Sequence, residues 1–265
     1  MKEGKTMKKI ITGTLCGILI PFLMVGTVFA GSRQSYSWYC VRNKDHLQPR
    51  LDANMRFVEA CGGYHVDKKH GDDCPEKIVY LTFDAGYENG NVAKILDILK
   101  AEKVPGAFFV LGNLITTNKD LILRMIDEGH TVCNHTYSHR DMTNCSNEEF
   151  ALELKKLEDA YSEVTGATMP KYYRPPEGKF SRENIEFANT LGYKTVFWSF
   201  AYADWDNDRQ MNPEEAKKKI LSNIHNGAII LLHPTSSTNA EILDDVIREL
   251  KSQGYEFGTL DQLTA

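Results

Sequence analysis

The chain has 265 residues, of which 42% are hydrophobic and 25% charged, a composition ordinary for one or two globular domains. This balance excludes a disordered or collagen-like chain. Residues 31–265 hold 27 basic and 35 acidic side chains, a net charge of −8. Such an acidic body excludes nucleic acid as an expected partner, because binding to phosphates needs a positively charged surface.

Residues 1–30 have the pattern of an export signal. Four lysines precede a stretch from Ile10 to Ser32 that contains no charged residue. The Val28–Ala30 triplet offers small residues at the positions that a signal peptidase reads. The apolar stretch is also about long enough to span a bilayer as an uncleaved anchor. Both outcomes place the rest of the chain outside the membrane, so we expect a cell-envelope or extracellular protein whose contact with the membrane is limited to this segment.

Beyond this segment, strand patterns alternate with helical ones. We expect residues 31–75 to form an N-terminal extension packed on a main domain of residues 76–265. Predicted strands in that domain cover residues 78–83, 106–111, 131–134, 172–174, 195–199 and 228–233, and predicted helices cover 93–99, 119–128, 148–165, 182–191, 213–224 and 240–251. Ser146 and Glu149 have the spacing of a capping box. Alternating strands and helices predict an α/β fold, a distorted TIM-like (β/α) barrel.

Several polar residues stand where the predicted strands end. Asp84, His135, Arg174 and His233 end the first, third, fourth and sixth of them, and Asp204 follows the fifth. In barrels of this kind the carboxyl ends of the strands carry the active site. Each residue alone has an ordinary structural explanation, such as a turn carboxylate or a satisfied core histidine. Their common position is what favours a catalytic site.

His135 and His139 are four residues apart directly after a predicted strand. On one helical turn their imidazoles would share a face and could share a metal ion. Two histidines at this spacing are often incidental, so the pair by itself is a weak signal.

The order of these features is more specific than any one of them. Five stretches resemble the five motifs of the polysaccharide deacetylases, the NodB-homology enzymes of carbohydrate esterase family 4: Thr82-Phe-Asp-Ala-Gly86, His135-Thr-Tyr-Ser-His139, Arg174-Pro-Pro-Glu-Gly178, Asp204-Trp205 and Leu232-His233. The resemblance covers about residues 76–262. Within the family, the stretches Tyr80–Gly90, Asn134–Thr143 and Phe197–Trp205 are most similar to the delta-lactam-biosynthetic N-acetylmuramic acid deacetylases of spore-forming bacteria.

This resemblance implies a NodB-type distorted barrel and metal-assisted removal of an acetyl group from N-acetylmuramic acid. A divalent metal, with Zn²⁺ as the first choice, would be bound by His135 and His139. Asp84 would be the general base, and Arg174 would hold it in its charged form. His233 would be the general acid that protonates the leaving amine.

Further residues receive supporting roles from the same resemblance. Asp204 would stabilise protonated His233 or orient Arg174, and both options stay open. The backbone N–H of Glu177 would complete an oxyanion site. Trp205 would offer a flat wall to the sugar. The remaining candidates are Tyr87 as a further substrate contact, and Lys179 with Arg182 as cations for the lactyl carboxylate.

The implied partner is a peptidoglycan glycan strand whose muramic acid has lost its peptide. The freed amine would then close a delta-lactam with the lactyl group, which by resemblance places the protein on the cortex side of the forespore. Ala85 departs from the wider family, which has a second aspartate there as a metal ligand. Two alternatives therefore stay open: a deacetylase of another N-acetylated glycan, such as N-acetylglucosamine or chitin-like chains, and a non-catalytic glycan-binding protein with a weakened metal site.

Overall fold

The longest strand, β3 (Lys77–Ala85), lies in the middle of a curled parallel sheet. Its first residues pair with β10, its last residues with β4, and its central and later residues with β9. From β4 the sheet continues through β5, β6 and β8. Just after β8, Phe200 forms a parallel bridge with Ile230 of β9, which closes the curl. The predicted α/β fold with a distorted barrel is confirmed. The other strands are β1 (Tyr36–Ser37), β2 (Gly63–Tyr64), β4 (Ala107–Val110), β5 (Thr131–Asn134), β6 (Tyr172–Tyr173), β7 (Lys179–Phe180), β8 (Lys194–Val196), β9 (Ala228–Leu232) and β10 (Tyr255–Phe257).

This computed structural model describes Met1 and residues 34–41 and 45–265. The predicted signal or anchor at residues 1–30 lies outside the described residues, apart from Met1. In the described part of the chain no helix is long and apolar enough to cross a membrane.

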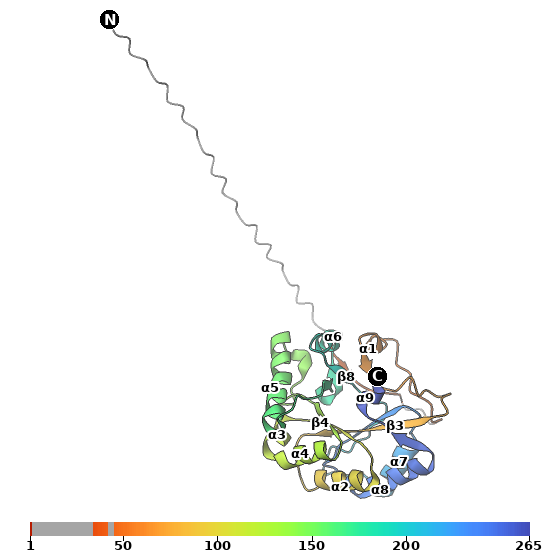
Figure 1. Ribbon diagram of the computed structural model, residues 1–265. Helices are drawn as coiled ribbons and strands as arrows, with labels where there is room; N and C mark the ends of the chain where they lie inside the picture. The colour runs from red at the N-terminus through yellow and green to blue at the C-terminus, as the bar shows by residue number, and fades with distance from the viewer. Residues whose placement is uncertain (2–33, 42–44) are drawn as a thin grey trace. The chain divides into compact units, whose positions relative to one another are not determined.

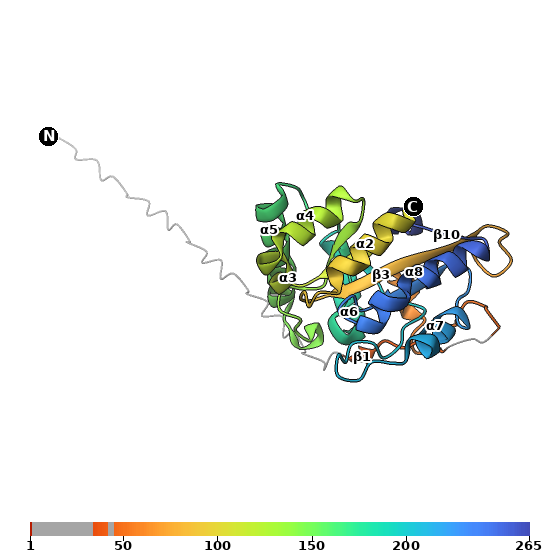
Figure 2. The ribbon, with the colours of Figure 1, turned by 90° about the horizontal axis from the view of Figure 1, so that it is seen from below.

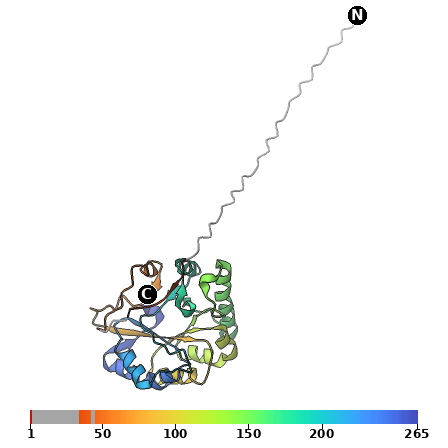
Figure 3. The same cartoon turned by 180° about the vertical axis from the view of Figure 1, so that it is seen from behind.

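The helices cover the outside of the sheet (Figure 1). They are α1 (Phe57–Ala60), α2 (Val92–Glu102), α3 (Gly112–Thr117), α4 (Lys119–Asp127), α5 (Asn147–Thr165), α6 (Arg182–Thr190), α7 (Pro213–Leu221), α8 (Ser237–Ser252) and α9 (Leu260–Leu263), with short 3₁₀ turns η1 (Met142–Asn144) and η2 (Pro176–Gly178). Helices α2, α8 and α7 lie side by side outside β3 (Figure 2). The view from behind shows the green helices, which include α5, at the right and the blue helices, which include α8, at the left, and both groups lie outside the sheet (Figure 3).

Side chains of β3 alternate between two apolar clusters, as the period of two in a strand requires. Leu81, Phe83 and Ala85 belong to the cluster between sheet and helices. Ile78 and Tyr80 belong to the cluster inside the curled sheet, which also contains side chains of α9. By the same alternation, the next two inward side chains, Thr82 and Asp84, lie inside the barrel near the carboxyl end of β3.

The predicted elements are largely present, with corrected ends. The capping box before α5 is confirmed, because Ser146 and Glu149 make both of its hydrogen bonds. The predicted strand at 195–199 ends at Val196, since the chain then turns towards β9. The helix predicted at 213–224 ends at Leu221, and the one predicted at 240–251 begins at Ser237. Helix α3 was not predicted.

The N-terminal extension pairs with the rest of the chain through two short strands, one in a separate two-stranded sheet and one at the edge of the curled sheet. Strand β1 pairs antiparallel with β7, and β2 pairs parallel with β8. The side-chain amide of Gln48 donates to the carbonyls of Asp67 (2.7 Å), His70 (3.2 Å) and Asn226 (3.0 Å). The contact with Asn226, together with the bridge between Val66 and Ala228, joins the extension to the start of β9. The boundary at residue 76 stays a prediction.

Candidate active site

The carboxyl end of β3 places two inward side chains against one arginine. Arg174 Nη1 lies 2.8 Å from Asp84 Oδ1, and Arg174 Nη2 donates to Thr82 Oγ1 over 2.8 Å. Thr82 and Asp84 are two residues apart, so they face the same side of the strand. Thr82 also donates to the carbonyl of Ile230 (2.7 Å), which ties this end of β3 to β9.

Arg174 is fully buried, and each of its three guanidinium nitrogens donates at least one hydrogen bond. Its guanidinium lies 4.1 Å from the centre of the Phe109 ring, so its position is fixed by stacking as well as by hydrogen bonds. Burial raises the pKa of Asp84, but the charge and hydrogen bond of Arg174, together with the two nearby imidazoles of His135 and His233, outweigh that effect at the low pH where Asp84 titrates, and the pKa is lowered. Asp84 is therefore an ionised carboxylate at neutral pH, as a general base requires.

The two histidines of the second motif lie in a loop, which corrects the helical turn considered for them. Thr136 and His139 have positive φ angles of 70° and 58°, and these residues fold the loop back on itself. Asn134 Oδ1 accepts from the backbone N–H of Thr136 (2.9 Å), and Thr136 Oγ1 accepts from that of His139 (3.0 Å). The imidazoles of His135 and His139 are thus brought within 5.1 Å, centre to centre.

His135 has one committed ring nitrogen and one free lone pair. Its Nδ1 lies 2.9 Å from the main-chain oxygen of Arg174, and because a carbonyl can only accept, Nδ1 carries the proton. Burial lowers the pKa of His135 to about 4, so the ring is neutral at pH 7. Nε2 then presents a lone pair to Asp84 Oδ2 at 3.5 Å. Two lone pairs facing each other at this distance favour a cation between them.

This donor set fits a divalent ion bound by few protein ligands. His135 and His139 supply two neutral imidazoles, and burial also lowers the pKa of His139. Ala85 is fully buried in the cluster between sheet and helices and supplies no oxygen. Within residues 34–41 and 45–265 no cluster of three or more His, Cys, Asp or Glu side chains could hold a metal ion. Catalytic zinc usually has three protein ligands, so binding here is expected to be weak.

A second charged pair follows β8 and β9. His233 Nδ1 lies 2.7 Å from Asp204 Oδ1, and its backbone N–H donates to Asp204 Oδ2 over 2.8 Å. Asn239 holds the same carboxylate from α8 at 2.6 Å. Burial lowers the pKa of His233, but the hydrogen bond and charge of Asp204 raise it more, and the net shift is upward. Of the two roles left open for Asp204, these contacts correspond to the support of His233.

The turn after Arg174 presents a backbone amide. Glu177 has a positive φ of 56°. The hydrogen bonds of the turn run from Gly178 N to the carbonyl of Pro175 and from Lys179 N to that of Pro176, so neither uses the Glu177 amide. The Lys179 ammonium pairs with the Glu177 carboxylate at 2.8 Å.

Arg182, the other cation considered for a lactyl group, is engaged by the extension. Its Nη1 lies 3.3 Å from Cys61 Sγ, and its guanidinium lies 4.5 Å from the centre of the Phe57 ring. Arg182 is thus held against the extension, whereas the Lys179 ammonium faces the carboxylates of Glu177 and Asp141.

Exposed aromatic side chains surround the same end of the barrel. Trp205 is 61% exposed, and its ring lies 6.2 Å from that of His233. Tyr87, from the loop after β3, is exposed and its hydroxyl contacts Asn207. Tyr137, between the two motif histidines, is also exposed, and sequence reasoning missed it although the motif contains it. Thr82 and Asn239 were missed too, and Asn239 gives no signal in the sequence.

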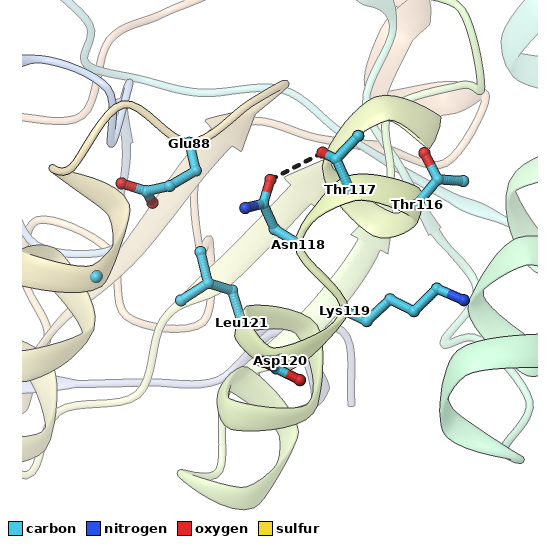
Figure 4. Close-up of a pocket in the computed structure, with 8 residues that line it drawn as sticks. Glu88, Thr116, Thr117, Asn118, Lys119, Asp120 and Leu121 are labelled. Atoms are coloured by element: carbon cyan, nitrogen blue, oxygen red, sulfur yellow. Dashed lines mark hydrogen bonds between the residues drawn. The ribbon is translucent and has the colours of Figure 1, made fainter.

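A cavity of about 560 Å³ lies between the loop after β3 and the junction of α3 and α4 (Figure 4). Asn118 and Leu121 point towards the space beside Glu88, whereas the Lys119 ammonium points away. Its lining includes neither the Asp84–Arg174 pair nor the His233–Asp204 pair, so it is separate from the candidate site.

The comparisons with known proteins agree with this geometry. A model described as polysaccharide deacetylase matches residues 71–196. The peptidoglycan-N-acetylmuramic acid deacetylase PdaA of Bacillus subtilis is 40% identical over 228 residues, which cover 86% of this chain and 85% of that protein. The peptidoglycan-N-acetylglucosamine deacetylase PgdA of Listeria monocytogenes is 36% identical over 71% of this chain and 39% of its own length. The chain belongs to the polysaccharide deacetylases, carbohydrate esterase family 4.

Two solved structures from the same family align with most of this chain. The structure of B. subtilis PdaA aligns with a TM-score of 0.82 and 38% identity, covering 87% of this chain and 97% of that one. A family 4 carbohydrate esterase from Bacillus anthracis aligns with a TM-score of 0.71 and 38% identity, covering 87% and 96% of the two chains. Both alignments span most of the described residues.

Proposed function

We propose that this protein removes the acetyl group from N-acetylmuramic acid in peptidoglycan whose peptide has already been removed. The observation that carries this proposal is the buried Asp84–Arg174 pair beside two histidines, with the His233–Asp204 pair near the same carboxylate. The likeness to PdaA supports the choice of sugar.

The residues divide the hydrolysis between them. Ionised Asp84 takes a proton from the attacking water. The Glu177 amide donates to the developing oxyanion. His233 gives its Nε2 proton to the nitrogen of the breaking amide bond, while Asp204 holds the Nδ1 proton and stabilises the charged ring. Water and amide are thereby converted to acetate and a free amine.

The proposal includes a metal ion, because two histidines beside Asp84 could bind one. His135 and His139 would hold a divalent ion, zinc as the first choice, beside Asp84 Oδ2. A bound ion would polarise the acetyl carbonyl and ease loss of a proton from the attacking water. Water and substrate oxygens would complete the coordination that Ala85 leaves open.

The product would close a ring within one sugar. Deacetylation frees an amine beside the lactyl carboxylate of the same residue, so lactam formation is intramolecular and entropically favoured. We further propose that Lys179 pairs with that carboxylate before the amine is freed, and that the protein acts outside the membrane after export through residues 1–30, on the cortex side of the forespore.

A second candidate is deacetylation of N-acetylglucosamine, which the likeness to PgdA favours. A third is glycan binding without catalysis, which the two-histidine donor set favours. The three candidate functions differ in which sugar of a peptidoglycan strand, if any, loses its acetyl group.

The test incubates purified protein, with and without zinc, with peptidoglycan stripped of peptides at muramic acid. Muramidase fragments are then weighed by mass spectrometry. Loss of acetyl from muramic acid supports the proposal, and further loss of water reports the lactam. Loss from glucosamine alone selects the second candidate. An unchanged mass with retained glycan binding selects the third.

A further inference from the structure

Main-chain carbonyls at the end of strand β8 hold Arg174. Arg174 Nε donates to the carbonyl of Val196 over 3.0 Å, and its Nη2 donates to that of Phe197 over 3.2 Å. Since Arg174 is fully buried, its position depends on where these two carbonyls lie. Whatever fixes residues 196–199 therefore fixes the partner of Asp84.

The next two carbonyls of the same segment are bound by the N-terminal extension. Trp38 Nε1 donates to the carbonyl of Trp198 over 2.9 Å, and Cys40 Sγ contacts that of Ser199 over 2.9 Å. Of these four consecutive carbonyls, the first two accept hydrogen bonds from Arg174 and the next two contact the extension. The two sets of contacts meet although the donors are more than a hundred residues apart in sequence.

Trp38 also holds the turn that follows Arg174. Its backbone N–H donates to the carbonyl of Gly178 over 2.8 Å, in continuation of the β1–β7 pairing. A Cβ added to Gly178 would lie 2.8 Å from the Trp198 ring and 3.0 Å from the Trp38 Cβ. The turn carrying Glu177 therefore rests directly on both tryptophans.

The Trp38 side chain is well placed to transmit this constraint. It is buried, and its ring is stacked on that of Phe197 at 4.3 Å between centres. Its indole N–H is the one polar group of that side chain, and a buried donor of this kind needs its acceptor.

We propose that Trp38 is a positioning residue of the active site, which holds the 196–199 carbonyls and the turn at 176–178 so that Arg174 and the Glu177 amide face Asp84 correctly. Through Trp38, the extension then contributes to the position of the catalytic groups. The kinetic half of this inference rests on the proposed deacetylation.

The test compares Trp38→Phe with Val58→Ala in the full chain. Trp38→Phe keeps an aromatic ring beside Phe197 and removes the donor to Trp198. Val58 is fully buried in the same cluster, over Gly63, so Val58→Ala loosens packing there without removing that donor. A second variant carries 3-benzothienylalanine at position 38, which retains the shape of the indole and lacks only its N–H.

Two readouts are taken at a temperature where each variant is fully folded. For both position-38 variants we expect kcat to fall about tenfold with KM within twofold, because small displacements of catalytic groups cost up to ~100-fold in rate. Hydrogen exchange in the peptide covering residues 172–180 should also become faster. Val58→Ala should lower the melting temperature and leave kcat and this exchange unchanged.

Equal kcat and exchange in the position-38 variants and Val58→Ala would overturn the inference. Failure of the proposed function is recognised separately, because the wild-type protein would then release no acetate. The exchange comparison still decides the positioning role in that case.

Discussion

The main-chain oxygen of Arg174 accepts a hydrogen bond from Nδ1 of His135 over 2.9 Å. This bond fixes the tautomer of the imidazole and leaves the lone pair on Nε2, an arrangement common in histidines that bind metals. The same residue whose guanidinium holds Asp84 thus also orients a candidate metal ligand.

We expect the protein to bind one zinc ion, and His139→Gln to weaken that binding at least ~10-fold because it removes one of two imidazole ligands. Isothermal titration calorimetry measures the affinity directly. His46→Gln is the matched control, since His46 contacts the carbonyl of Ile224 instead. Identical isotherms for the wild type and His139→Gln would contradict the two-histidine site.

Replacing Arg174 should be costly to stability. Arg174→Met leaves the Asp84 charge buried without its partner, a change that typically costs ~3–5 kcal/mol. Urea unfolding measures the difference. Arg248→Met is the control, because Arg248 is exposed and its pairing with Glu102 is accessible to water. A loss for Arg174→Met no larger than that of the control would show that the buried pair is not stabilising.

The same variant should change the pH dependence of stability. In the wild type the pKa of Asp84 is below its ordinary value of 3.8, so its contribution is present above that pH and is lost as pH falls through the folded-state pKa. Without Arg174, burial should raise that pKa, and the contribution of Asp84 should then decrease as pH rises. Urea midpoints between about pH 3 and 7 test this reversal.

Asp204 should set the alkaline limit of activity. The raised pKa of His233 keeps its acid form available at higher pH, and activity is lost as pH rises through that pKa. Asp204→Asn removes the charge that raises it, so the descending limb of the kcat profile should move to lower pH and kcat at neutral pH should fall. Asp206→Asn, on the exposed part of the same loop, should leave the limb in place. An unchanged pH profile in Asp204→Asn would show that Asp204 does not set the pKa of the general acid.

Lys179 and Arg182 make a matched pair for substrate selectivity. If Lys179 binds the lactyl carboxylate, Lys179→Ala should raise KM for muramic acid substrates about two- to fivefold, the range that a solvent-exposed ion pair supplies. N-acetylglucosamine substrates should be unaffected. Arg182→Ala should change neither, because that side chain contacts Cys61 and Phe57. Steady-state kinetics on both sugars decide between these outcomes.

The parts of the fold with strong local patterns could be predicted from the sequence. The apolar run of β3 and the capping box of α5 are local features, and both are found where they were expected. Strands β1 and β2 have two residues each and exist because Tyr36 meets Phe180 and Gly63 meets Thr195, distant pairings that no local pattern contains. Helix α3 has only six residues, too few for a clear helical period.

The site was predictable as a set of residues and not as a geometry. The order of the motifs selected Asp84, Arg174 and His233 as candidates, because a carboxylate, a guanidinium and an imidazole can each be recognised from the residue type alone. The spacing of His135 and His139 does not predict the backbone angles that bring their rings together. The left-handed conformation of Thr136 is stabilised by a hydrogen bond to the side chain of Asn134, which the spacing does not show.

The pairing of β3 with both β9 and β10 has a consequence for how the molecule acquires its structure. The central strand is complete only when residues 228–232 and 255–257 have joined it, and the extension must also be in place beside β8. Contacts between such distant segments make folding slow. A nascent chain would therefore remain open until residues 255–257 had been synthesised, and removal of residues 255–265 would delete β10 and leave the first residues of β3 without that neighbour.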